Sequence, residues 1–300
     1  MSSFILFCKS YRNDVLRVKK LCESIKKFNL DFIPFYLSVP SADIDLFKKI
    51  IDFESPYFSN NSLFHLITDE EIVAANPKSN IAHYKSIPGY ISQQCIKAEA
   101  WRLLQCDNYL CLDSDSLFTK AFHLNDFFHS DGNPYTVIHD GTDLLTLANK
   151  LNKQDVLVNF YKDSNLLKHE FGREGADYDF GPTPVIWSSR VWATLDQEHL
   201  TPQQETIWDA FERLPMELRW YGESVLKYQA IPRHPIHPLF TCYHYEWQYI
   251  ELQKNPPDRQ KDSMGIVLQS NWDHSLQPKF VYKPWYSRLW KNLKQTIKKL

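Results

Sequence analysis

The sequence NYLCLDSDSLF, residues 108–118, runs an apolar segment into two carboxylates, Asp113 and Asp115, that stand two positions apart. In a strand, side chains at positions i and i+2 point to the same face, so these two acids would repel each other without a counter-charge. In open α/β sheets, ligands bind at the carboxyl ends of the strands. The segment therefore predicts a buried strand whose polar end holds a cation.

The residues before this strand have the pattern of an α/β protein. Residues 4–9 are apolar, residues 15–28 carry apolar side chains at helical spacing, and residues 31–40 return to strand character. Residues 89–105 place apolar side chains along one helical stripe immediately before the acidic strand. Since β-α-β units build parallel sheets with covering helices, we expect an α/β fold.

The second half of the chain is expected to complete the same unit. Residues 135–140 and 182–189 have strand character, and residues 201–214 and 219–230 have helical character. We find no internal repeat and no low-complexity linker. We therefore predict one main domain over residues 1–280.

Composition excludes several classes of function. The 300 residues carry a net charge of −2 and a sequence pI near 6.6, which gives no electrostatic case for nucleic acid as a partner. The six cysteines form no C-x-x-C pair and no Cys/His cluster with zinc spacing, so we expect them to be reduced and structural. The absence of a basic leader and of a span of about 20 apolar residues predicts a cytoplasmic protein.

The segment 93–118, QQCIKAEAWRLLQCDNYLCLDSDSLF, resembles the core of metal-dependent glycosyltransferases of the GT-A fold, in particular a bacterial group that assembles surface polysaccharides. Residues 4–29 are similar to the first β-α unit of that group. The resemblance covers about the first 120 residues. It implies a mostly parallel central sheet flanked by helices, with a nucleotide-binding part over residues 1–120 and an acceptor-side extension over residues 121–280.

The resemblance also implies roles for individual residues. Asp113 and Asp115 would bind Mn²⁺ or Mg²⁺ and, through the ion, the diphosphate of a nucleotide sugar, while Ser114 would approach the ribose. Such cations prefer oxygen ligands and can neutralise a departing diphosphate. The alternative is that both acids cap the turn that follows the strand.

Other candidates for nucleotide contact lie on either side of this motif. The loop after the first strand would receive the nucleotide, with Tyr11 stacked on the base and Lys9 or Arg12 donating to phosphate. On the helix before the motif, Gln94 and Lys97 are three positions apart and would face the sugar or the diphosphate. The alternative for both groups is a solvated polar surface.

Glycosyl transfer needs a base for the acceptor hydroxyl or a way to stabilise a front-side attack. Glu223 is the first candidate base, because it is an acid in an aromatic and apolar neighbourhood, and Asp179 and Asp177 are its rivals. A His beyond the main sheet completes the metal shell in many related enzymes, which makes His244, His237 and His274 candidate ligands. The usual role of a single His is structural.

The last residues, 282–300, contain no acid and place apolar side chains on one helical face, with Lys and Arg over most of the rest. We predict a basic amphipathic helix over residues 281–300 that lies on the inner membrane surface, where anionic lipid adds about 1 kcal/mol per nearby Lys or Arg. The alternative is that this stripe packs on the domain.

Together these features predict transfer of a hexose from a nucleotide sugar, UDP-linked, to a hydroxyl of a lipopolysaccharide or capsule glycan. Two alternatives remain open. One is a sugar nucleotidyltransferase, although residues 7–14 lack the glycine-rich loop of those enzymes. The other is a non-catalytic glycan-binding protein at the membrane.

Overall fold

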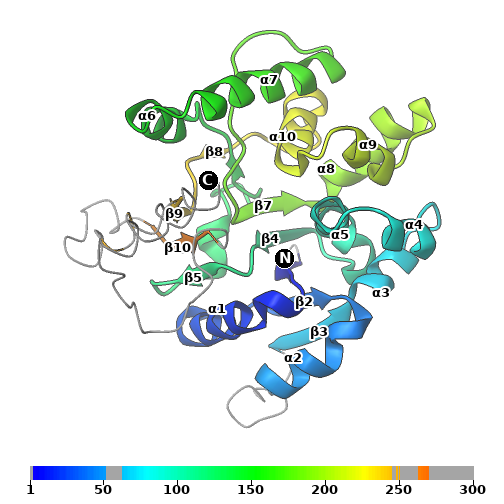
Figure 1. Cartoon of the computed structure of the whole chain (residues 1–300), viewed down its shortest axis with the longest axis vertical. Coiled ribbons are helices and arrows are strands. Elements are labelled where there is room, and N and C mark those ends of the chain that lie inside the picture. The colour runs from blue at the N-terminus through cyan, green and yellow to red at the C-terminus, as the bar shows by residue number, and fades with distance from the viewer. Residues whose placement is uncertain (1–2, 52–62, 245–247, 249, 251–262, 270–300) are drawn as a thin grey trace, which may run out of the picture.

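The computed structural model of the chain describes residues 3–51, 63–244, 248, 250 and 263–269. The helix predicted over residues 281–300, and His274, lie outside these residues. Figure 1 shows the described part as a central sheet with helices packed on either side of it.

The central sheet has five strands in the order β3-β2-β1-β4-β7. Strands β1 to β4 are parallel to their neighbours, and β7 is antiparallel to β4. The strands are β1 Phe4–Lys9, β2 Phe35–Val39, β3 Phe64–Thr68, β4 Asn108–Leu112 and β7 Val185–Ser188. The expected α/β fold with a mostly parallel central sheet is therefore confirmed.

Helices cover both faces of this sheet. The larger ones are α1 Val15–Phe28, α2 Ile44–Ile51, α5 Gly89–Leu104, α6 Thr142–Lys150, α7 Gln154–Glu170 and α10 Glu217–Tyr228. The shorter ones are α3 Asp69–Ala74, α4 Ile81–Ser86, α8 Ser189–Thr194 and α9 Ile207–Arg213. Helices α1, α2 and α5 place apolar side chains in the cores against the sheet, which holds these layers together.

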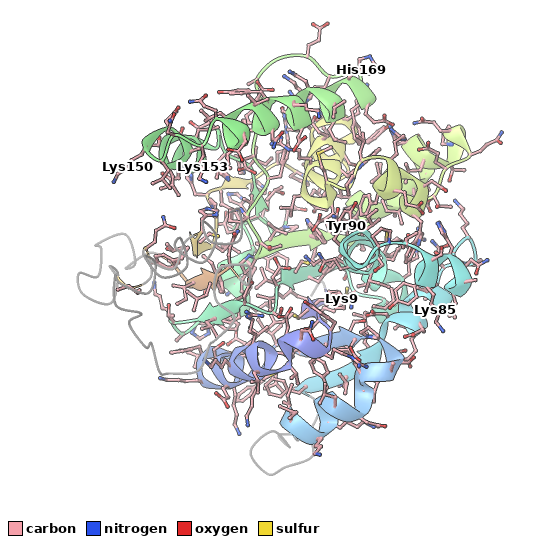
Figure 2. All side chains as sticks on the ribbon, viewed as in Figure 1. Lys9, Lys85, Tyr90, Lys150, Lys153 and His169 are labelled. Atoms are coloured by element: carbon pink, nitrogen blue, oxygen red, sulfur yellow. The ribbon has the colours of Figure 1, made fainter. Side chains whose placement is uncertain are left out.

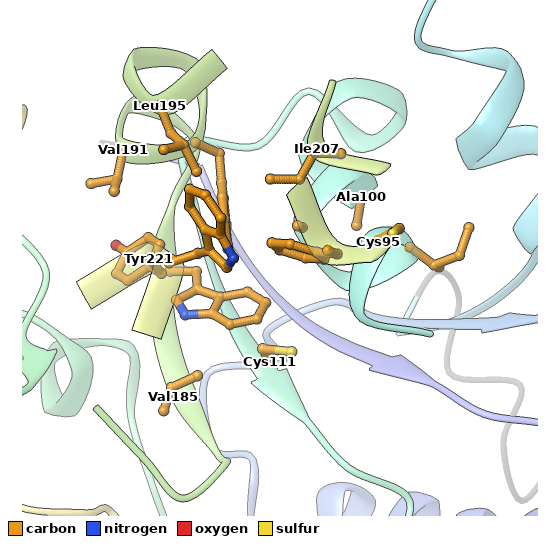
Figure 3. Packing of buried hydrophobic residues seen from close by; sticks show 14 of the residues in the cluster. Cys95, Ala100, Cys111, Val185, Val191, Leu195, Ile207 and Tyr221 are labelled. Atoms are coloured by element: carbon orange, nitrogen blue, oxygen red, sulfur yellow. The ribbon is translucent and has the colours of Figure 1, made fainter. Parts of the chain in front are cut away.

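The two faces of the sheet bury different cores. On one face, leucines of β1 and β4 pack with the buried stripe of α1 and with α2. On the other, Phe7, Tyr109 and Trp187 lie edge to face across three neighbouring strands, with ring centroids 6.1 and 5.8 Å apart. This second core continues into α5, α8, α9 and α10, as Figure 3 shows around Tyr221 and Ile207. Much of the aromatic content thus fills the core.

A small three-stranded sheet, in the order β5-β10-β9, extends the fold beyond β4. Its strands are β5 Ser116–Phe118, β9 Phe240–Tyr243 and β10 Gly265–Leu268. A parallel pair, β6 Thr136–Val137 and β8 Pro235–Ile236, connects the segment after β5 with the segment before β9. These pairings bring residues late in the chain to the end of the acidic strand.

Two predicted elements differ from the structure. The strand predicted over residues 135–140 pairs only over the two residues of β6. The helix predicted over residues 201–214 begins at Ile207 as α9, because Thr206 and Asp209 form a capping box there. Helices α6 and α7 were not predicted.

Two glycines allow the loop between α7 and β7 to pack closely against α10. A β-carbon on Gly222 would lie 2.0 Å from the Phe180 ring, and one on Gly181 would lie 2.6 Å from Leu218. A larger residue at either position would require Phe180 or Leu218 to shift. The loop thus follows α10 closely on its way to the sheet edge.

Replacing Gly222 by Ala should therefore lower the free energy of unfolding by about 1 to 3 kcal/mol, the usual cost of overpacking a core. Urea denaturation of the two proteins measures this difference. Gly89→Ala is the matched control, because Gly89 also lies in a helix and a β-carbon there has no heavy atom within 4 Å. A Gly222→Ala protein as stable as the control would contradict the tight packing.

Candidate active site

The carboxyl ends of β1 and β4 meet at the point where the sheet reverses its direction of growth. The chain runs from β1 outward to β2 and β3, and then returns to place β4 on the other side of β1. Such switch points form the crevice in which α/β sheets bind ligands. The loops that follow the two strands are joined by a hydrogen bond of 3.1 Å from Ser114 Oγ to Asp14 Oδ2.

Asp113, the first residue after β4, forms an ion pair with a lysine side chain. The Lys97 ammonium, on α5, lies 2.6 Å from Asp113 Oδ1, and the Thr183 hydroxyl donates to Asp113 Oδ2. The Lys97 side chain is 5% exposed and that of Asp113 is 35% exposed. The carboxylate therefore keeps an accessible side toward solvent, although both of its oxygens have partners.

Glu217, at the start of α10, completes this charged group, with its carboxylate 3.5 Å from the Lys97 ammonium. Burial disfavours the Lys97 charge, but Asp113 and Glu217 outweigh it and raise the pKa of Lys97. Burial also opposes ionisation of Asp113, yet the Lys97 ammonium lowers the pKa of Asp113 below its usual value. Burial and the Asp113 charge raise the pKa of Glu217 and outweigh the lowering effect of Lys97. The group thus holds one cation between two acids.

Asp115 lies where the small sheet meets the main one. Its backbone carbonyl accepts a hydrogen bond of 3.0 Å from the Leu268 amide, at the end of β10. Leu268 pairs in turn with Tyr243 on β9, so His244, the next residue, lies at the same sheet edge. The side chains of Arg17 and Lys20 line a small hollow of about 10 Å³ beside Asp115.

These placements bring Asp113, Asp115 and His244 to one corner of the molecule. Their donor set, two carboxylates and an imidazole, fits Mn²⁺ or Mg²⁺. Among the described residues, however, their ligand atoms are not one of the groups that lie within 4.8 Å of one another. Binding one ion with all three would require side chains at this corner to move.

Of the predicted nucleotide contacts on the first loop, Lys9 and Arg12 are paired with acids of the protein. The Lys9 ammonium, at the end of β1 (Figure 2), lies 2.8 Å from Asp69 Oδ2, and both side chains are buried. Arg12 pairs with Asp43 at 2.6 Å, although its own side chain is 59% exposed. Tyr11 is 45% exposed and so presents its ring at the surface.

Gln94 does not point toward the acidic strand. Its carbonyl oxygen accepts the Glu217 amide at 3.1 Å, and its amide nitrogen donates to the Tyr90 carbonyl at 3.0 Å. The side chain is buried in these two contacts. In this structure Gln94 positions the first turn of α10, and through it Glu217.

The three candidate bases have different surroundings. Glu223 is 1% exposed, and both carboxylate oxygens accept hydrogen bonds from the Arg173 guanidinium. Asp177 pairs with Lys168 at 2.5 Å. Asp179 accepts a hydrogen bond of 3.1 Å from the Gly181 amide, in the loop that carries Thr183 to Asp113.

Burial lowers the pKa of the His244 imidazole overall. The Asp179 carboxylate is close enough to oppose this shift by raising the same pKa. His237 is exposed, with its ring 6.0 Å from that of His139. Asp179 and His244 are thus the members of their candidate sets that lie near each other.

The family of this chain is shown by its sequence. The family of unknown function DUF6492 matches residues 3–236, which includes the main sheet and all the charged residues of the switch point. The chain is a DUF6492 protein. None of the curated proteins matches it.

Solved structures similar to this DUF6492 protein include three transferases. The galactosyltransferase LgtC, in complex with donor and acceptor sugar analogues, has 12% identity and a TM-score of 0.44 over 98% of this chain and 95% of its own. The WbbM bifunctional glycosyltransferase has 11% identity and a TM-score of 0.49 over 91% of this chain and 46% of its own. Mouse xyloside xylosyltransferase 1 has 9% identity and a TM-score of 0.47 over 90% of this chain and 99% of its own.

A cavity of about 220 Å³ opens beside the site, between α6, the start of α7 and the ends of β9 and β10. Its wall is aliphatic on α6, through Leu144 and Leu147, and polar at His244 and Gln269. Lys153, at the junction of α6 and α7, also lines it (Figure 2). The cavity thus has its polar end at the corner that holds Asp115.

Within the described ranges, no helix of this DUF6492 protein is long and apolar enough to cross a bilayer.

Proposed function

We propose that this protein is a metal-dependent glycosyltransferase that moves a hexose from a UDP-linked sugar to a hydroxyl of a lipopolysaccharide or capsule glycan. The observation that carries the proposal is the position of Asp113 and Asp115 at the carboxyl end of β4, beside β1, at the switch point of the sheet. A diphosphate is the ligand that best explains two acids at this edge, because it binds carboxylates through a divalent cation.

Asp113, Asp115 and His244 would hold the Mn²⁺ or Mg²⁺ ion. When bound, that ion supplies positive charge to the departing nucleoside diphosphate. Lys97 keeps Asp113 ionised and oriented through their contact of 2.6 Å. Arg17 and Lys20, beside Asp115, add positive potential on the side of α1.

The nucleoside would lie over the first loop. Tyr11 presents an exposed ring for stacking on a base, and Ser114 is at the position expected to approach the ribose. Lys9 and Arg12 would reach phosphate only by leaving Asp69 and Asp43. Their present contacts favour a role in shaping the loop that receives the nucleotide.

Asp179 is the better placed base for the acceptor hydroxyl. It lies in the same loop as Thr183, which touches Asp113, and it is near His244 at the polar end of the cavity. Glu223 is buried and bound at both oxygens by Arg173, so it supports the packing of α10. The cavity beside α6 would then take part of the acceptor, and the helix predicted over residues 281–300 would hold the enzyme at the membrane where a lipid-linked acceptor lies.

Calorimetric titration of UDP with and without Mn²⁺ tests the donor site. Coupling between two ligands is typically 5- to 150-fold, so Mn²⁺ should tighten UDP binding by about 10-fold or more in the wild type. In Asp115→Asn the same ion should change UDP binding by less than about 2-fold, because the ion loses a carboxylate ligand. Asp45→Asn, on the exposed start of α2, is the control and should behave as the wild type.

Equal UDP affinity with and without Mn²⁺ in the wild type would contradict the proposal. Release of pyrophosphate from UTP and a sugar phosphate would favour the sugar nucleotidyltransferase. Metal-dependent UDP-sugar binding without turnover on any glycan would favour the non-catalytic binding protein.

A further inference from the structure

A second group of potential metal ligands lies outside the site described above. It consists of His129, Asp131 and His234, whose ligand atoms all lie within 4.8 Å of one another. Among the residues that the structure describes, no other group of three or more His, Cys, Asp or Glu side chains has its ligand atoms this close together. We call it the His-Asp-His cluster.

The backbone fixes all three residues in place. His129 and Asn133 close a turn with a hydrogen bond of 2.9 Å from the His129 amide, and the Asn133 amide donates to Asp131 Oδ1 at 3.0 Å. His234 precedes β8, and its carbonyl accepts the Thr136 amide of β6 at 2.9 Å. Two segments about a hundred residues apart therefore present their side chains to one point.

The potential ligand atoms of the three side chains lie close together. The two imidazole rings are stacked with centroids 3.8 Å apart and planes 14° apart. One Asp131 oxygen lies 3.2 Å from His129 Nδ1, and the other lies 2.8 Å from His234 Nε2. A neutral imidazole offers a lone pair, which is the form that binds metal. Because the lone pairs of stacked rings point in nearly parallel directions, one ring would have to turn before both could bind the same ion.

We propose that the His-Asp-His cluster binds a divalent transition-metal ion such as Zn²⁺. Two nitrogens and one carboxylate oxygen suit ions of borderline softness, in contrast to the oxygen-rich donors at Asp113 and Asp115 that suit Mn²⁺ and Mg²⁺. Partial exposure, 40% for His129 and 19% for His234, leaves room for water as a fourth ligand. The bound ion ties the 129–133 turn to β8.

Calorimetric titration of Zn²⁺ into the full chain tests this site. The parent protein carries Asp113→Asn and Asp115→Asn, so that the sheet edge cannot take the ion through its carboxylates. We expect one saturable Zn²⁺ site per chain. His129→Ala and His234→Ala should each weaken it by more than the 10- to 100-fold that the loss of an outer-shell partner costs.

His123→Ala, in the same parent, is the matched control. His123 also pairs with an exposed carboxylate, at 2.8 Å from Asp31, but this pair has one imidazole where the cluster has two. It should leave Zn²⁺ affinity within about 2-fold of the parent. Thermal melts in the presence of chelator should be the same for all variants, which would show that each is folded. Asp131→Asn provides a third test of the ligand set.

Either of two results would overturn the inference. One is the absence of a saturable Zn²⁺ site in the parent. The other is a site that survives in His129→Ala and in His234→Ala. Both results are independent of UDP binding. The test of this metal site therefore does not depend on whether the proposed glycosyltransferase activity is correct.

Discussion

Replacing Lys97 by Met is expected to lower the free energy of unfolding by about 3 kcal/mol at pH 7, and to abolish metal-dependent nucleotide binding. Removing one partner of a buried ion pair typically costs about 3 to 5 kcal/mol, because the other charge stays buried without compensation. Here Glu217 would be left beside Asp113 with no cation between them. The partial exposure of Asp113 places the cost at the lower end of that range.

The pH dependence of this loss gives a second signature. In the wild type, the lowered pKa of Asp113 contributes stability above the unfolded-state pKa of about 3.9, and this is lost as the pH falls through the folded-state pKa. Without Lys97, both carboxyls should have raised pKa values in the folded protein. The native state then binds more protons than the unfolded state, so the stability of Lys97→Met should fall as the pH rises.

Urea denaturation at pH 5 and pH 8 measures both effects. Lys97→Met should lose more stability, relative to the wild type, at pH 8 than at pH 5. Lys85→Met, at an exposed lysine on α4 (Figure 2), should match the wild type at both values. A loss of the same size at both pH values would mean that packing, and not charge, explains the role of Lys97.

Asp179→Asn is expected to lower kcat for sugar transfer by about 10²- to 10⁴-fold, the usual contribution of a general base. The affinity for UDP and Mn²⁺ should stay within about 2-fold of the wild-type value, because Asp179 is not among the proposed metal ligands. Asn keeps the acceptor oxygen for the Gly181 amide, so the loop should hold its conformation. Turnover of a UDP-sugar, with binding measured in parallel, tests this role.

Glu223→Gln is the matched comparison for Asp179→Asn. Its carboxylate binds Arg173 through both oxygens, so the change should act on stability and leave the kcat of the folded enzyme within about 3-fold. The reverse result, with kcat lost in Glu223→Gln and kept in Asp179→Asn, would identify Glu223 as the base in place of Asp179.

The first half of the fold could be predicted from the sequence because its signals are local. β1, α1, β2, α5 and β4 each show the apolar spacing of their own element, and β4 ends in an acidic pair that marks the ligand edge. Helices α6 and α7 were missed, since several of their apolar side chains are exposed. Val158, for example, is 63% exposed.

The partners within the site could not be predicted, because they come from distant segments. Thr183 and Glu217 meet Lys97 and Asp113 only once α10 and its loop have packed against α5. Spacing along the chain could suggest that Lys97 faces the acidic strand. It could not show that Gln94, three residues earlier, would turn to the backbone of α10.

The small sheet that supports Asp115 also sets an order of events during synthesis. The last strand of the main sheet, β7, ends at Ser188, whereas β10 ends at Leu268, 80 residues later. At the usual ribosomal rate of about 5 to 20 residues per second, the ribosome needs about 4 to 16 s to add those residues. For that interval, a nascent chain can have its main sheet in place while β5 still lacks its neighbour. The protein would therefore become able to hold the proposed ligand only after β10 has been synthesised.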